Sequence, residues 1–139
     1  MIGDWTWSSE LRIPSATSAT SQAIDPLLAH LHDEAWTEHD IFGVHLAVEE
    51  ALVNAIKHGN RESEAKSVRV QYRSNGNCVQ IEITDEGEGF DPQSISDPTS
   101  PEHLEEPNGR GLLLMRSFMT RVEFNAVGNQ VLLEKCRST

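Results

Sequence analysis

The stretch His45–Asn60, HLAVEEALVNAIKHGN, decides the fold of this chain. Its apolar residues alternate steps of three and one, which is the spacing that lays one stripe of an α-helix against a core. This stripe consists of Val44, Ala47, Val48, Ala51, Leu52, Ala55 and Ile56. Gly59 and Asn60 end the pattern, since both residue types favour the end of a helix. The sequence therefore predicts a buried helix, with Thr37 as its N-cap.

A second apolar set on the same helix consists of Phe42, Leu46 and Val53. It projects about 150° away from the first stripe at about 100° per residue, so we expect the helix to be covered on two sides. Glu50 and Asn54 lie one helical turn apart on the narrow polar strip that remains. A carboxylate and an amide on a mostly buried helix suggest a functional site, whereas the simpler interpretation is a solvated edge with a polar pair.

Composition limits the class of protein. With 139 residues, 37% hydrophobic and 24% charged, the chain fits one soluble domain spanning residues 1–139. The formal charge of −11 argues against direct contact with nucleic acid and favours a basic protein partner. The N-terminus carries no signal-peptide pattern, and no apolar run approaches the roughly 20 residues of a membrane span. We therefore expect a cytoplasmic protein without membrane contact.

Cysteines and histidines give no independent site. Cys78 and Cys136 are predicted to be buried, reduced thiols, because the chain has no secretory signal. The six histidines show no metal-ligand spacing and are interpreted as surface or packing residues.

The N-terminal part of the chain predicts a strand and a helix before the central helix. Alternation from Trp5 to Ile13 indicates a strand, which Pro14 ends. A helical pattern reaching Trp36 follows, and it is expected to begin near Asp25 because Pro26 is tolerated in a first helical turn.

The C-terminal half predicts two hairpins around one more helix. Alternating segments on either side of Asn75-Gly76 indicate a hairpin, with positive φ angles at its turn. The segment 91–108 is longer than most loops within domains and is typical of a lid. A helical pattern after Gly109-Arg110-Gly111 and a last hairpin, with its turn at Gly128-Asn129, complete the chain.

Two glycine-containing turns lie beside these elements. Asp85 ends a buried strand and is followed by Gly87 and Gly89, where backbone can approach a flat ligand that the carboxylate binds. Gly109 and Gly111 precede a helix, whose N–H groups and positive dipole end favour phosphate oxygens. Taken singly, each motif is also compatible with an ordinary structural turn.

In this order, the central helix, the Asp turn and the glycine turn resemble the site of the GHKL ATP-binding family. The matching segments are Glu50–Asn54, Asp85–Gly89 and Gly109–Leu112. The strings NAIKHGN and GRGLLLMRSFMTRVEF and the short segment 91–108 are most similar to the bacterial anti-sigma factor serine kinases. The resemblance covers nearly the whole chain. It implies a two-layer α/β sandwich, the GHKL (Bergerat) fold, with helices on one face of a mixed, mostly antiparallel sheet.

The resemblance also implies a site for ATP and Mg²⁺. Asn54 would hold Mg²⁺, and Glu50 would be the general base that accepts the proton of a protein serine. Asp85 would bind the adenine amino group. The remaining nucleotide-binding residues would be Gly87, Gly89, Gly109, Arg110, Gly111 and Leu112.

The function that follows is an anti-sigma factor with serine/threonine protein kinase activity. Its partners would be a sigma factor and an anti-sigma factor antagonist, the latter being the kinase substrate, and a homodimer is possible. Some relatives carry a basic residue two positions before the first glycine of the turn, where this chain has Pro107. A catalytically silent ATP-binding module of a partner-switching or two-component system is therefore the alternative. A domain that binds no nucleotide is a third hypothesis.

Overall fold

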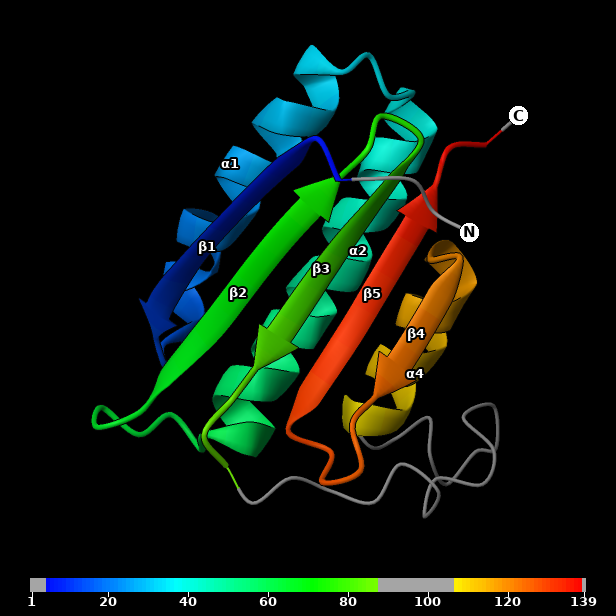
Figure 1. Cartoon of the computed structure of the whole chain (residues 1–139). Coiled ribbons are helices and arrows are strands. Elements are labelled where there is room, and N and C mark those ends of the chain that lie inside the picture. Colours follow the sequence, from blue (N-terminus) through cyan, green and yellow to red (C-terminus); the bar gives the residue numbers. More distant parts are fainter. Residues whose placement is uncertain (1–4, 88–106, 139) are drawn as a thin grey trace.

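The computed structural model describes residues 5–87 and 107–138, and of residues 107–110 it describes the backbone alone. One five-stranded sheet, in the strand order β1-β2-β3-β5-β4, carries helices on one face (Figure 1). The strands are β1 (Trp7–Pro14), β2 (Ser67–Ser74), β3 (Cys78–Thr84), β4 (Arg121–Phe124) and β5 (Gln130–Cys136). Each described pairing is antiparallel. The predicted two-layer sandwich is confirmed.

Three longer helices form the second layer. They are α1 (Thr20–Asp33), α2 (Glu38–Asn54) and α4 (Pro107–Phe118), with short segments η1 (Thr17–Ala19) and η2 (Ala55–Gly59) before α1 and after α2. Helix α2 packs against both of the other helices and crosses behind the centre of the sheet (Figure 1). Within residues 5–87 and 107–138, no helix is both long and apolar enough to cross a membrane.

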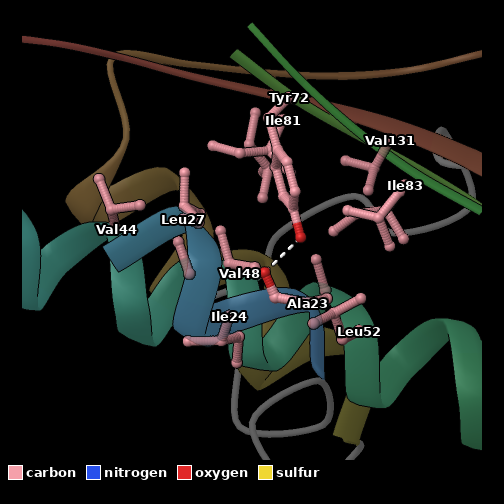
Figure 2. Close-up of a cluster of buried hydrophobic side chains, with 14 of the residues drawn as sticks. Ala23, Ile24, Leu27, Val44, Val48, Leu52, Tyr72, Ile81, Ile83 and Val131 are labelled. Atoms are coloured by element: carbon pink, nitrogen blue, oxygen red, sulfur yellow. Dashed lines mark hydrogen bonds between the residues drawn. The ribbon is translucent and has the colours of Figure 1, made fainter. Parts of the chain in front are cut away.

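The core lies between this helical layer and the inner face of the sheet. The strands alternate, so their apolar residues point toward the helices, as Figure 2 shows for Tyr72, Ile81, Ile83 and Val131. Burying one large side chain of this kind contributes about 1.5–3 kcal/mol. The hydroxyl group of Tyr72 donates to the carbonyl oxygen of Ala23, which ties β2 to α1 (Figure 2). Burial raises the pKa of this tyrosine.

The N-terminal end of α2 is fixed. The side chain of Thr37 accepts a hydrogen bond from the backbone N–H of Asp40 at 3.2 Å, so the predicted N-cap is confirmed. The carboxylate of Asp40 is buried and accepts hydrogen bonds from the backbone and hydroxyl of Ser138, with Lys135 Nζ 3.7 Å away. Burial would raise the pKa of Asp40, but these partners hold it below its ordinary value. The residues after β5 therefore anchor the first turn of α2.

Helix α1 differs from its prediction at both ends. It begins at Thr20 rather than near Asp25, and Pro26 lies inside it. The carbonyl group that Pro26 leaves without an N–H partner belongs to Gln22, and both residues are exposed, so water can satisfy it. Trp36 lies beyond the helix end, where it is buried after the positive φ angle of Ala35.

The first hairpin turn also differs in detail. Only Gly76 has a positive φ angle, whereas Asn75 was expected to share it. Asn75 acts instead through its side chain, because its Oδ1 accepts from the backbone N–H groups of Asn77 and Cys78. These two hydrogen bonds close a three-residue turn in place of a two-residue one.

The second apolar face of α2 is covered only in part. Leu46 and Val53 are half-buried, but Phe42 remains 56% exposed and meets Phe118 of α4 edge-on, with ring centroids 6.2 Å apart. The expectation that this side of the helix is also covered therefore does not hold at Phe42.

Cys78 and Cys136 form a disulfide bond, so the prediction of two reduced thiols is wrong. The two residues face each other across the antiparallel pair of β3 and β5, with Cα atoms 4.0 Å apart. They lie on the helix-free face of the sheet, at the end of β3 that is remote from Asp85. The spacing of 58 residues gave no sign of this pairing, which depends on the strand register.

A pH dependence of stability follows from His30 of α1. Its ring stacks on the indole of Trp7 with centroids 3.7 Å apart, and its Nε2 lies 2.8 Å from Ser74 Oγ. Burial lowers the pKa of His30, against the opposing charges of Glu34 and Asp33. Because the unfolded chain binds this proton more readily, the contribution is full above the unfolded pKa of about 6.5 and is lost as the pH falls toward the folded pKa.

We expect the free energy of unfolding, measured in urea, to fall as the pH is lowered from about 7.5 to about 5.5. His30→Gln should reduce this slope, because glutamine does not titrate. His39→Gln, at an exposed histidine of α2, is the matched control and should keep the slope of the wild type. Identical slopes in His30→Gln and wild type would show that His30 does not carry the effect.

Candidate functional site

Helix α2 holds Glu50 and Asn54 at a fixed position beside α4. Both side chains are half-buried, and their neighbours Ala51 and Leu52 are in the core, so the helix cannot rotate without unpacking. Gly111 of α4 lies directly against them. A Cβ atom at Gly111 would be 2.7 Å from Asn54 Nδ2 and 3.4 Å from Glu50 Oε2. The structure therefore brings together residues from two of the three predicted motifs.

The helix continues past Asn54 with a wider turn. In η2 the backbone N–H of Asn60 donates to the carbonyl oxygen of Ala55 at 2.8 Å, an i to i+5 bond that accommodates one extra residue. Such a turn inside a helix is often found at functional sites. It places Gly59 against Asp85, where a Cβ atom at Gly59 would overlap the carboxylate. The π-helical turn thereby joins α2 to the Asp turn.

The backbone of Gly59 leaves no room for a side chain at Gly87. A Cβ atom at Gly87 would overlap the carbonyl oxygen of Gly59, so only glycine allows the two backbones this close approach. The sequence predicted that glycines here let the backbone approach a ligand. The structure adds a second reason for Gly87, which is its close packing against the backbone of Gly59. Gly89 lies outside the described residues.

Asp85 follows β3 and is 9% exposed. Burial raises the pKa of its carboxyl group, while a hydrogen bond from the backbone N–H of Gly87 and the charge of Lys66 act in the opposite direction. The Gly87 bond to Oδ1 is 2.8 Å long. Asp85 is therefore a buried acceptor that the turn holds in one orientation.

A cavity of about 580 Å³, including its open mouth, lies beside Asp85. Asn54 and Asp85 contribute polar atoms to its lining, while Leu112 and Met115 of α4 form an apolar part of its wall. A largely apolar, open-mouthed cavity with one fixed carboxylate suits a flat heterocycle that carries an amino group. Glu50 is not part of the wall and lies one helical turn from Asn54.

Sequence reasoning did not select several other residues that line this cavity. They include His58, Phe124, Asn129 and Gln130. The last three belong to the β4–β5 hairpin, which was interpreted only as a structural turn. Its Gly128-Asn129 signal marks the turn correctly, but only the pairing of β5 with β3 brings it beside Asp85.

The glycine turn Gly109-Arg110-Gly111 lies within α4, not before it as predicted. The helix begins at Pro107, because the fixed φ angle of proline and its missing N–H suit a first helical position. A helix leaves the N–H groups of its first turn without partners inside the helix, so the backbone from residue 108 to residue 110 is available for an anion. Most of the predicted lid, 91–108, lies outside the described residues.

The described residues contain no cluster of three or more His, Cys, Asp or Glu side chains that could hold a metal ion by themselves. A cation at this site would therefore depend on Asn54 and on oxygen atoms of the nucleotide and water. This is the coordination that Mg²⁺ prefers beside phosphates, so the donor set is compatible with Mg²⁺.

Comparison with known proteins agrees with this geometry. The chain belongs to the histidine kinase-like ATPase domain family, whose sequence pattern it matches over residues 13–135. The nucleotide that this family binds is ATP, so the cavity beside Asp85 is the candidate ATP site.

Individual relatives are similar over most of their length. The chain is 28% identical over 122 residues to serine-protein kinase RsbW of Oceanobacillus iheyensis, covering 84% of this chain and 77% of the relative. It is 29% identical over 127 residues to an anti-sigma F factor of Clostridium beijerinckii, covering 86% and 80%. It is 28% identical over 93 residues to serine/threonine-protein kinase BtrW of Bordetella bronchiseptica, covering 66% of each.

Proposed function

We propose that this chain is an ATP-dependent serine/threonine protein kinase that acts as an anti-sigma factor and phosphorylates an anti-sigma factor antagonist. The observation that carries the proposal is the contact of Gly111 with both Glu50 and Asn54, beside the cavity of Asp85. The kinase and anti-sigma factor names of the similar proteins agree with it. The whole chain, residues 1–139, acts as one domain in the cytoplasm.

Asp85 recognises the adenine base. Its fixed carboxylate accepts a hydrogen bond from the adenine amino group, while Leu112 packs on the ring. Gly87 and Gly89 shape the same pocket. Burial of Asp85 strengthens the hydrogen bond, because little water competes for the carboxylate.

The phosphates lie between α4 and α2. Backbone N–H groups at Gly109 and Arg110 bind phosphate oxygens at the positive end of α4, Gly111 contacts the phosphates without a side chain in the way, and the guanidinium group of Arg110 neutralises charge there. Asn54 holds Mg²⁺ through its side-chain oxygen. When bound, Mg²⁺ supplies charge neutralisation of the phosphates and fixes their position.

Glu50 is the general base. It accepts the hydroxyl proton of the substrate serine as the serine oxygen attacks the γ-phosphate in line. Its place on the packed α2, one turn from Asn54, sets the direction of attack relative to the phosphates. A module that only bound ATP would have no chemical need of a carboxylate at this position.

Transfer of labelled phosphate from ATP to a candidate antagonist tests the activity. A pull-down from the host, with and without ATP, identifies the partners, which we expect to be a sigma factor and its antagonist; a homodimer is compatible with both. A phosphorylated serine on the antagonist is the expected result. Wild-type protein that phosphorylates nothing in the host proteome contradicts the kinase proposal.

One observation favours a second candidate, a catalytically silent ATP-binding module. Pro107 stands at the start of α4, where some relatives carry a basic residue that could reach the γ-phosphate. In that case ATP would only shift the protein toward the conformation that binds its partner. ATP-dependent partner binding without phosphate transfer distinguishes this module from the kinase.

Asp85→Asn is expected to weaken ATP binding by about 10- to 150-fold, because a charge-assisted hydrogen bond is worth about 1.5–3 kcal/mol. The amide holds less charge and can present its NH₂ group to the adenine amino group. Calorimetry on the folded variant measures the change, with Glu86→Gln, at the exposed neighbouring carboxylate, as the matched control. Wild-type ATP affinity in Asp85→Asn would refute the adenine assignment.

A further inference from the structure

Asn60 is a buried polar residue at the end of η2, 1% exposed, that has no part in the proposed chemistry. Its Nδ2 donates to Ser15 Oγ at 2.9 Å and to the carbonyl oxygen of Ser67 at 2.9 Å. Its Oδ1 accepts from the backbone N–H of Glu86 at 2.7 Å. Both ends of the amide are therefore engaged, and a hydrophobic residue of similar size would leave three polar groups without this partner.

The hydrogen bond to Glu86 acts on the Asp turn. The N–H of Glu86 belongs to the peptide group that directly follows the Cα atom of Asp85. The carbonyl oxygen of the same peptide group accepts from Asn129 Nδ2 at 3.4 Å. Two asparagine side chains, from η2 and from the β4–β5 hairpin, thus hold one peptide plane from opposite ends.

The fixed peptide plane holds the Asp85 side chain through the next residue, because the backbone N–H of Gly87 donates to Asp85 Oδ1 at 2.8 Å. The backbone N–H of Asp85 also donates to the carbonyl oxygen of Asn129 at 2.9 Å, so both peptide groups around its Cα atom are held. Rotation of the Asp85–Glu86 peptide would move the Gly87 N–H away from Oδ1 and leave the carboxylate free to turn relative to the cavity. Asn60 is the partner in this arrangement that does not line the cavity and so does not touch a ligand there.

We propose that Asn60 is the positioning residue for the base-reading carboxylate of Asp85, and through it a determinant of adenine over guanine selection. The inference rests on the proposed function, in which Asp85 accepts from an amino group of the base. Guanine presents a carbonyl oxygen where adenine presents its amino group. A carboxylate held in place repels that oxygen, whereas one that can turn away tolerates it.

Asn60→Ala tests this proposal. We expect the affinity for ATP, measured by calorimetry, to fall about tenfold, the effect of losing one well-placed hydrogen bond. We expect the ratio of ATP to GTP affinity to fall with it. The rate of phosphate transfer at saturating ATP should remain near that of the wild type, because Glu50 and Asn54 are untouched. A change in the KM for ATP and in base selectivity, without a change in kcat, would distinguish a positioning role of Asn60 from a general loss of native structure.

Two further variants control for stability. Asn60→Asp keeps an oxygen for the N–H of Glu86 and should retain most of the base selectivity. Ser15→Ala removes a partner of Asn60 Nδ2 and the bond from Ser15 Oγ to the Lys66 carbonyl oxygen, but leaves Glu86 alone. It should lower the free energy of unfolding and keep the wild-type selectivity. If Asn60→Ala does not fold, Asn60→Ser, which is too short to reach the same partners, replaces it.

The outcomes separate this inference from the proposed function. If wild type prefers ATP and Asp85→Asn reduces that preference, but folded Asn60→Ala keeps it, Asn60 does not position Asp85 and the inference is refuted. An equal loss of selectivity in Ser15→Ala would also refute it, since stability alone would then explain the effect. If wild type binds ATP and GTP equally, the adenine site itself is wrong and the inference falls with it.

Discussion

Glu50→Gln is expected to lower the rate of phosphate transfer to a protein serine by about two orders of magnitude or more, with ATP affinity near that of the wild type. Glutamine keeps the shape of the side chain and can hydrogen-bond, but it cannot accept the proton of the serine hydroxyl. Most of the rate in phosphoryl transfer comes from positioning and charge neutralisation. These contributions remain with Asn54 and the first turn of α4.

The neighbouring carboxylate gives a matched control. Glu49 lies on the same helix, but its Oε1 is 3.4 Å from the hydroxyl group of Thr20, beside α1. Glu49→Gln changes the charge of the protein by the same amount and should transfer phosphate at the wild-type rate. Asn54→Ala should differ from both variants, because it loses the oxygen that holds Mg²⁺ and with it ATP affinity. Wild-type transfer by Glu50→Gln would show that Glu50 is not the base.

Reduction of the disulfide between Cys78 and Cys136 is expected to lower the free energy of unfolding by about 4 kcal/mol. The bond joins residues 58 positions apart, and removing it returns that much loop entropy to the unfolded chain. Urea titrations with and without a reducing agent measure the change. ATP affinity should stay the same, because the bond lies at the end of β3 remote from Asp85.

Cys136→Ser is the control for this experiment. Its stability should match that of the reduced wild type and should not respond to the reducing agent. Wild-type stability that does not change after both thiols are shown by alkylation to be free would contradict the expectation.

Local signals predicted the elements of this fold well. The three-and-one spacing of apolar residues reports burial within one helix, and the alternation around Asn75-Gly76 reports one hairpin, so neither needs distant residues. The start of α1 was missed because the rule that places proline in the first helical turn does not consider solvent exposure. Here the Gln22 carbonyl group, which has no N–H partner at Pro26, can bind water instead. The disulfide was missed because it depends on the register of β5 against β3, which no short window contains.

Some residues of the site could likewise be predicted from local sequence, whereas others depend on contacts between distant segments. Glu50, Asn54, Asp85 and Gly111 could be selected from motif spacing, and the structure places Gly111 against the first two and Asp85 beside the cavity. Their chemical roles stay predictions. Asn60 was interpreted only as the end of a helix, since the three partners of its side chain come from segments that are far apart in the sequence. A buried asparagine and an exposed helix-terminal asparagine look identical before the chain folds.

Helix α2 and the π-helical turn η2 that follows Asn54 tolerate different kinds of sequence change. Before Asn54, the buried apolar side chains can be exchanged for others of similar volume, because the packing is that of an ordinary helix. Between Asn54 and Asn60 the number of residues itself is constrained. Deleting one residue there would rewind the turn to an α-helix and carry Asn60 about 100° around the axis, away from Glu86. Homologous chains should therefore vary across this turn at exposed positions such as Lys57, but not in its length.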